Sequence, residues 1–174
     1  MFVVEDGTGE DPDANSYASV ADFKAYWDDR GFNYTIYSPD SVIQRALIKA
    51  TDFIERKYGR NFLGCRLLGL TQPLSWPRAY VYLHGSVVEG LPIQLVRATH
   101  EYAKIALESP EGLAPNPGGY DATRQIVNTT IVKVGPVEKH QKYEAGSGAN
   151  LRTYPYADGL LAELISGSGG VVRN

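Results

Sequence analysis

Apolar residues recur with helical spacing in three long segments of the chain. These segments are residues 19–30, 39–58 and 92–109. Ser19 followed by Asp22 resembles a capping box at the start of the first segment, and Pro39 and Pro92 stand at the first-turn positions that proline prefers. The pattern therefore predicts three helices. Apolar residues cover much of the circumference of the third, which is typical of a central helix or of one that a partner also covers.

The hydrophobic period changes from helical to alternating after these segments. Apolar and polar residues alternate over 123–134, Gly135 and Pro136 form a turn signal, and a weaker alternation follows over 137–143. This pattern predicts a β-hairpin or two extended arms at about 123–143. A short amphipathic helix is predicted over 157–165.

Segments rich in glycine, proline and polar residues separate the predicted elements. We expect residues 60–91 to form a long ordered connection, because a loop of this length inside a compact domain normally has a function. The expected fold is mainly α: a small bundle of three main helices and a short C-terminal helix, with the hairpin or arm beside it. The expected parts are an acidic N-terminal loop or arm (1–18), a helical core (19–109), a linker with the hairpin (110–156), and a C-terminal helix and tail (157–174).

Composition is compatible with one packed domain. The chain has 174 residues, of which 43% are apolar, and this is enough for a core. Its only cysteine, Cys65, cannot form an internal disulfide, and we expect it to be a small buried residue. No apolar run approaches the roughly 20 residues that cross a bilayer, and the N-terminus turns acidic after four residues, unlike a signal peptide. We therefore expect no membrane association.

The charge is slightly negative and unevenly distributed. The formal net charge is −3, whereas a domain that coats nucleic acid usually has a basic surplus. Residues 1–15 hold five acidic residues and no base, whereas residues 123–152 hold five bases and two acids. Two hypotheses remain open: these regions attract each other between neighbouring copies, or they are separate solvated surfaces.

No catalytic motif is apparent in the sequence. The three histidines, His84, His100 and His140, do not have the spacing of helical zinc ligands, and the chain contains neither a phosphate-binding loop nor a G-x-S-x-G elbow. We expect no enzymatic activity, no metal and no cofactor. A hydrolase would need a cleft around His84 or His100, but His100 is expected to pack on the apolar side of its helix.

Aromatic and basic residues alternate in the segment SWPRAYVYLHG. One hypothesis is that this segment binds single-stranded nucleic acid, because aromatic side chains interleaved with basic side chains can stack on nucleobases. The residues that would do so are Trp76, Arg78, Tyr80 and Tyr82. Tyrosine and arginine are equally the favoured anchors of protein–protein contacts, which fits a net-negative chain better. If the segment is one strand, Tyr80 and Tyr82 lie on the same face.

Several short motifs occur in a particular order: ANSY at 14–17, A-T-D followed by apolar residues from 50, SWPR at 75–78 and VGP at 134–136. In this order the chain resembles the small head–tail adaptor (head-completion or connector) proteins of tailed bacteriophages. That group is often labelled DnaT-like single-stranded-DNA-binding. The resemblance covers about residues 5–165.

The resemblance implies a structural protein of the virion neck, assembled in the host cytoplasm. It implies a homo-oligomeric ring, typically twelve-fold, between the portal protein and a tail-side completion or terminator protein, with DNA passing through the lumen without sequence recognition. The alternative function is a single-stranded-DNA-binding replication accessory protein. The residues expected at interfaces are Trp76, Arg78, Tyr80, Tyr82, Ile131, Lys133, Lys139, Lys142, Leu160, Leu161, Leu164 and Ile165.

Overall fold

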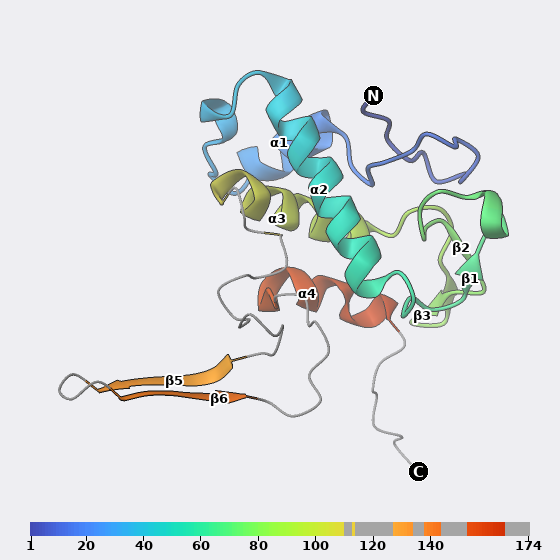
Figure 1. The fold of residues 1–174 in the computed structure, drawn as a ribbon. Helices are drawn as coiled ribbons and strands as arrows, with labels where there is room; N and C mark the ends of the chain where they lie inside the picture. Colours follow the sequence, from blue (N-terminus) through green and yellow to red (C-terminus); the bar gives the residue numbers. More distant parts are fainter. Residues whose placement is uncertain (110–112, 114–126, 134–137, 144–152, 166–174) are drawn as a thin grey trace, which may run out of the picture. The chain divides into compact units, whose positions relative to one another are not determined.

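The computed structural model describes residues 1–109, 113, 127–133, 138–143 and 153–165 (Figure 1). The chain divides into two compact units. The first comprises Met1–Gly112 and Tyr154–Asn174, and the second comprises Leu113–Thr153. The predicted C-terminal tail and the 110–122 linker lie outside the described residues, apart from position 113.

The first unit is a helical bundle. Helix α2 packs along α3, α3 packs against α4, and α1 contacts both α2 and α3. The three predicted main helices and the short C-terminal helix are thus confirmed, and the fold is mainly α with a small β component. Within the described residues, no helix is long and apolar enough to cross a membrane. The helices are α1 (Val20–Asp28), α2 (Asp40–Tyr58), α3 (Ile93–Glu108) and α4 (Pro155–Leu161).

The helix boundaries follow from local chemistry. Ser19 Oγ accepts a hydrogen bond from the Asp22 amide at 3.0 Å, and its hydroxyl donates to the Asp22 carboxylate at 2.7 Å, so the predicted cap is confirmed. Pro39 is the N-cap of α2, one position before the predicted first turn. Gly59 closes α2 by donating its N–H to the Glu55 carbonyl at 3.0 Å.

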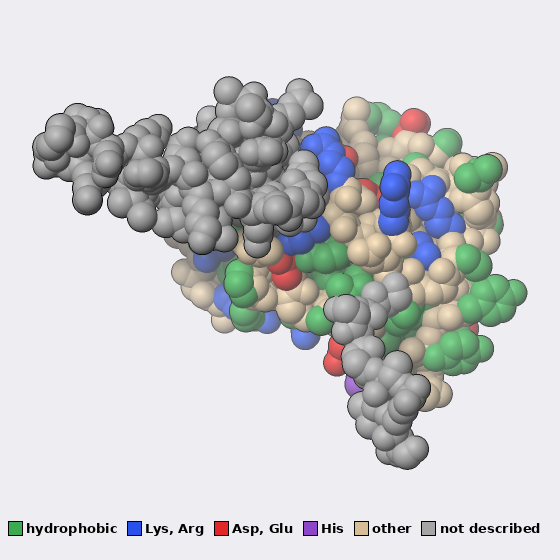
Figure 2. Space-filling model, turned by 60° about the horizontal axis from the view of Figure 1, so that its bottom comes forward, with side chains coloured by type: hydrophobic (Ala, Val, Ile, Leu, Met, Phe, Trp, Pro, Cys, Tyr) green, Lys and Arg blue, Asp and Glu red, His purple; other side chains and the backbone are tan. Residues whose placement is uncertain are grey.

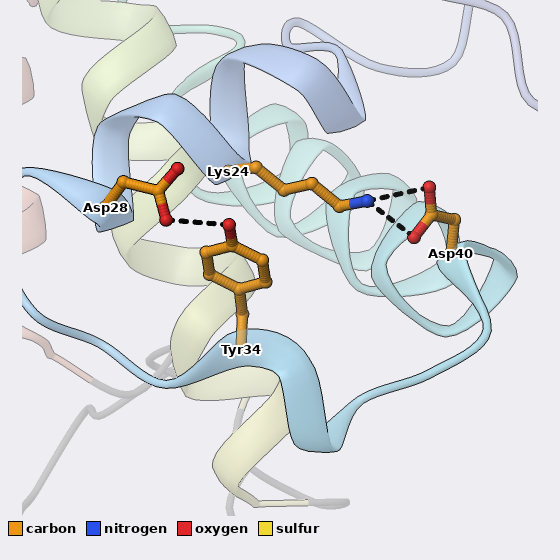
Figure 3. A network of polar contacts seen from close by, with 4 residues as sticks. All are labelled: Lys24, Asp28, Tyr34 and Asp40. Atoms are coloured by element: carbon orange, nitrogen blue, oxygen red, sulfur yellow. Dashed lines mark hydrogen bonds and ion pairs between the residues drawn. The ribbon is translucent and has the colours of Figure 1, made fainter.

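Two polar contacts connect α1 to the segment that leads into α2 (Figure 3). Lys24 Nζ lies 2.7 and 2.9 Å from the two carboxylate oxygens of Asp40. The Tyr34 hydroxyl, in the short 3-10 helix η1 (Tyr34–Ile36), donates to Asp28 at 2.7 Å. Because these groups are largely exposed, each contact contributes little to stability and mainly fixes the path of the connection.

The N-terminal segment folds onto the bundle. Residues 16–18 are buried, and Val4 forms a parallel bridge with Ser16. The Tyr17 hydroxyl donates to the Glu55 carboxylate on α2 and accepts the Trp76 amide at 3.2 Å. Residues 14–18 of the predicted loop or arm thus pack against the helical core, because Tyr17 fills a buried position between α2 and the 60–91 connection.

The 60–91 connection is ordered, as predicted, but contains short strand pairs. Its elements are β1 (Cys65–Arg66), η2 (Gly69–Thr71), β2 (Arg78–Ala79), β3 (Tyr82–Leu83) and β4 (Ser86–Val87). Strands β1 and β2 pair antiparallel, as do β3 and β4. The prediction that Cys65 is buried is wrong: it is exposed, because a two-residue strand at the surface covers neither face.

The second unit contains an antiparallel strand pair, which confirms strands within the predicted 123–143 segment. Strand β5 (Val127–Lys133) pairs with β6 (Glu138–Tyr143). In this register Ile131 stands opposite His140, and Lys133 stands opposite Glu138. An irregularity between Val127 and Thr129 shifts the pairing at the start of β5.

Candidate functional site

Four basic side chains lie along the exposed side of α2 and the turn that follows it. We call this set, Arg45, Lys49, Arg56 and Arg60, the α2 basic stripe. Steps of four and seven residues return Arg45, Lys49 and Arg56 to nearly the same side of α2, and Arg60 lies in the turn after the helix. Over the described part of the chain, none of the four takes part in an ion pair. Asp52 is the one acidic residue on this side.

The stripe is a consequence of the amphipathic sequence of α2. The opposite side of the helix carries buried residues, among them Ile43, Leu47 and Ile54. Burying that side turns the bases toward solvent over about 16 Å between Arg45 and Arg56. Figure 2 shows Lys and Arg side chains grouped together on one face of the molecule. With four bases against the single acid Asp52, this row suits a phosphate backbone, because each contact with a phosphate releases condensed counterions.

Trp76 does not belong to a binding surface in this structure. The side chain is 0% exposed and packs edge-to-face on Phe62, with ring centroids 5.8 Å apart. An aromatic ring without exposed surface cannot stack on a base or contact a partner, so the interface prediction for Trp76 is corrected. Trp76 follows Ser75, whose hydroxyl donates a hydrogen bond of 2.6 Å to the Glu55 carboxylate.

Arg78 has an internal role. Its guanidinium is half-buried and donates to the carbonyls of Leu63 at 2.6 Å and Gly64 at 2.8 Å. It also donates to the carbonyls of Phe62 and Ser75. With its donors engaged in this way, Arg78 stabilises the 60–91 connection, and its predicted role at an interface stays a prediction.

Tyr80 and Tyr82 are exposed, at 77% and 62%, but they do not share one strand as expected. Tyr80 has a φ of 61°, and this left-handed conformation interrupts the extended backbone between β2 and β3. Tyr82 pairs with Val87 across β3 and β4. Together with other exposed apolar residues they line a hollow of about 710 Å³. We call it the apolar groove and define it by Leu67, Leu68, Tyr80, Tyr82 and Val87.

The predicted anchors on the C-terminal helix are partly buried in the bundle. Leu161 and Leu164 are 0% exposed, and they present no surface to a partner, which corrects that part of the interface prediction. Leu160 and Ile165 are half-buried, and Ile165 forms an antiparallel bridge with Phe62. Helix α4 and the 3-10 helix η4 (Ala162–Leu164) are therefore part of the bundle core.

The remaining predicted interface residues belong to the second unit. Ile131 and Lys133 lie in β5, and Lys139 and Lys142 lie in β6, where Lys142 stands opposite Thr129. Their backbone register is defined, while their side chains lie outside the described part of the chain.

The histidines differ in their surroundings. His100 is buried against the rings of Phe23 and Tyr26, with centroids 5.9 and 4.9 Å away, and this burial lowers its pKa to about 4. It lines a hollow of about 340 Å³ together with Asp22, Asp29 and Arg30. His84 is exposed, 3.4 Å from Glu163. Among the described residues, no cluster of three or more His, Cys, Asp or Glu could hold a metal.

Comparison with known families identifies the class of the protein. A family model described as "Putative DnaT-like ssDNA binding protein" matches residues 1–174, so the chain belongs to this family. The comparison with curated proteins gave no match, and the comparison with solved structures gave none either. These comparisons give no support to the resemblance to phage head–tail adaptors.

The α2 basic stripe is the feature that sequence reasoning missed. The signal was present: bases at positions 45, 49 and 56 lie opposite the apolar stripe of the most regular helix. The net charge of the whole chain, −3, did not indicate the stripe, because it sums residues that the fold places on different surfaces.

Proposed function

We propose that the protein binds single-stranded DNA through the α2 basic stripe. The observation that carries this proposal is the row of exposed bases at Arg45, Lys49 and Arg56, none of which forms an ion pair with the described acidic residues. The family description supports the same function. Contacts of this kind recognise phosphates and not bases, so the binding is independent of sequence.

The binding is weak and depends on salt. Since the formal net charge is −3, affinity rests on the local field of the stripe, and the acidic N-terminal residues oppose it. Non-specific dissociation constants of about 1 to 100 µM at physiological salt are ordinary for such contacts. Because Trp76 is buried, it contributes no stacking to this interaction.

A titration of fluorescein-labelled dT30, followed by anisotropy at about 0.15 M salt, tests the proposal. The triple variant R45Q/K49Q/R56Q removes three bases from the stripe. Its matched control, R30Q/R97Q/K104Q, removes three bases outside the stripe, on α3 and directly after α1. We expect the stripe variant to bind at least about tenfold more weakly and the control to change less than about twofold. A wild-type protein that does not bind, or equal losses in both variants, contradicts the proposal.

A second candidate function is the structural head–tail adaptor. The observation that favours it is a large exposed apolar groove together with a strand-pair unit distinct from the helical unit, since proteins that assemble present such surfaces to neighbours. In this function the chain forms a ring, twelve-fold in the family it resembles, between the portal and a tail-side protein. Mass spectrometry of purified virions tests this candidate: the protein is present in stoichiometric amounts if it is an adaptor and absent if it is not.

A further inference from the structure

The apolar groove exposes hydrophobic side chains that the fold does not cover. Tyr80 and Tyr82 are 77% and 62% exposed, and Val87 and Leu67 are 56% and 48% exposed. Figure 2 shows hydrophobic side chains gathered at the right-hand edge of the molecule, the side on which Figure 1 labels β1 to β3. The groove has a volume of about 710 Å³, within the size range of ligand pockets. Contiguous apolar surface of this kind is typical of a site that another molecule covers.

Contacts within the helical unit fix the walls of the groove. The Glu5 carboxylate accepts a hydrogen bond from the Gly7 amide at 2.9 Å, and a Cβ added to Gly7 would lie 3.3 Å from the Gly90 Cα. The buried Gln72 side chain accepts a hydrogen bond from the Leu68 amide at 3.2 Å. The groove is therefore formed before a partner arrives, which lowers the entropic cost of binding.

The charges of the groove define the chemistry of its partner. Glu10 and Glu89 line it, both are exposed, and neither takes part in an ion pair with the residues that the structure describes. Arg78 also lines the groove, but its guanidinium donates to four backbone carbonyls. The remaining carboxylates repel phosphate and attract a guanidinium or ammonium group. The faces of the Tyr80 and Tyr82 rings attract the same cations.

Short strands at the groove favour an extended partner. The lining includes Arg78 and Ala79 of β2, Tyr82 of β3 and Val87 of β4. Among the described strands, β1 pairs only with β2 and β3 only with β4, so each of them keeps one edge without a strand partner. Such edges can accept an extended peptide, whose alternate side chains then contact the surface beside the strand.

We propose that the apolar groove binds an extended segment of a partner protein in which arginine or lysine alternates with apolar residues. The cationic side chains pair with Glu10 and Glu89, and the apolar side chains cover Tyr80, Tyr82 and Val87. A second copy docked groove to groove would bring the carboxylates of both copies together, so the charges favour a different protein. The proposal rests on the groove alone and is independent of DNA binding by the α2 basic stripe.

Titration of the isotope-labelled full chain without DNA, followed by amide proton–nitrogen correlation NMR, tests the proposal. The probe is the peptide acetyl-Val-Arg-Leu-Arg-Val-amide, and its neutral counterpart carries citrulline at both arginine positions. We expect the arginine peptide to shift the amide signals of Tyr82, Val87 and Glu89 and to bind at least about tenfold more tightly than the citrulline peptide. A peptide with glutamate at both positions is expected to leave these signals in place.

The variant E10Q/E89Q separates charge pairing from apolar contact. It is expected to bind the arginine peptide at least about tenfold more weakly than the wild type, and the citrulline peptide within about twofold of the wild type. The matched control D29N/D52N removes two carboxylates outside the groove and is expected to change the affinity for the arginine peptide by less than about twofold. All four positions are exposed, and the NMR spectrum of each variant shows whether it is folded.

Three results overturn the proposal: groove signals of the wild type that do not move at about 5 mM arginine peptide, equal affinity for the arginine and citrulline peptides, or equal losses in the two variants. Groove signals that move with protein concentration alone identify a second copy as the occupant, and groove signals that move with an oligothymidine identify nucleic acid. Either result also overturns it. A failure of DNA binding at the α2 basic stripe leaves these outcomes unchanged.

Discussion

Lys57 Nζ lies 2.7 Å from Asp158 Oδ2, and this ion pair joins the last turn of α2 to the first turns of α4 across 101 positions of sequence. The Tyr102 hydroxyl on α3 donates to the other carboxylate oxygen, and the Tyr154 amide donates to Oδ2 at 2.9 Å. Burial raises the pKa of Asp158, but the hydrogen bonds from Lys57 and Tyr102 outweigh it and leave the pKa below its usual value. One carboxylate thus connects three helices.

Replacing Asp158 with asparagine is expected to destabilise the helical unit by about 2 kcal/mol, because charge-assisted hydrogen bonds are lost and Lys57 keeps no carboxylate at this position. Urea unfolding followed by circular dichroism measures the change. The control is D52N. Asp52 is exposed on α2, the helix that carries Lys57, and its replacement is expected to change the free energy of unfolding by less than about 0.5 kcal/mol. Equal stability of D158N and D52N contradicts the structural role of Asp158.

His100 makes the stability of the fold depend on pH. Its pKa is about 4 in the folded chain, because burial disfavours the charged ring; Asp22 opposes this shift and Arg30 adds to it. In the unfolded chain the His100 ring has a pKa near 6.5. Its contribution to the free energy of unfolding is therefore fully present above that pH and falls by about 3 kcal/mol as the pH is lowered to about 4.

Urea unfolding of the wild type and of H100F at pH 7.5, 6, 5 and 4 checks this. We expect H100F to lose less unfolding free energy than the wild type as the pH is lowered. H84Q changes an exposed histidine and is expected to lose as much as the wild type. If H100F and the wild type lose stability in parallel, His100 is not the responsible group.

Both tryptophans of the chain are buried, Trp27 at 4% and Trp76 at 0% exposure. Iodide is therefore expected to quench the emission of the native protein only weakly, and saturating oligonucleotide to leave that emission nearly unchanged. Unfolding in urea makes both rings accessible and is the internal control. Strong quenching on addition of DNA shows that a tryptophan ring stacks on bases and contradicts the fold around Trp76.

The thiol of Cys65 is exposed in the folded protein and is the only one in the chain. A thiol reagent such as dithionitrobenzoate is expected to react with one equivalent of thiol in the native state, at a rate within about tenfold of the urea-unfolded chain. A native rate several orders of magnitude lower shows that Cys65 is covered, either by the fold or by an oligomeric contact.

Local sequence patterns predicted the helices because their signals are local. Ser19 and Asp22 cap α1, and the apolar stripe of α2 is the side that the core buries. Exposure within the 60–91 connection was not predictable in this way. Trp76 and Tyr82 are only six residues apart, yet one is fully buried and the other is 62% exposed.

What separates these two residues is a set of long-range contacts. Tyr17 and Glu55, distant in sequence, fix the Ser75–Trp76 backbone, and the positive φ of Tyr80 turns the chain outward. The candidate site followed the same rule: the bases of α2 were visible in the sequence, but whether an acidic side chain pairs with them depends on long-range packing.

The salt dependence of the oligonucleotide affinity tests the central claim most directly. For single strands, the slope of log K against log salt is about −0.7 for each phosphate neutralised, so contacts from the four bases of the stripe predict a slope of about −3. R45Q/K49Q/R56Q is predicted to reduce the slope to about −1, because Arg60 alone remains. A wild-type slope near zero, or a slope that the triple variant leaves unchanged, contradicts DNA binding by the α2 basic stripe.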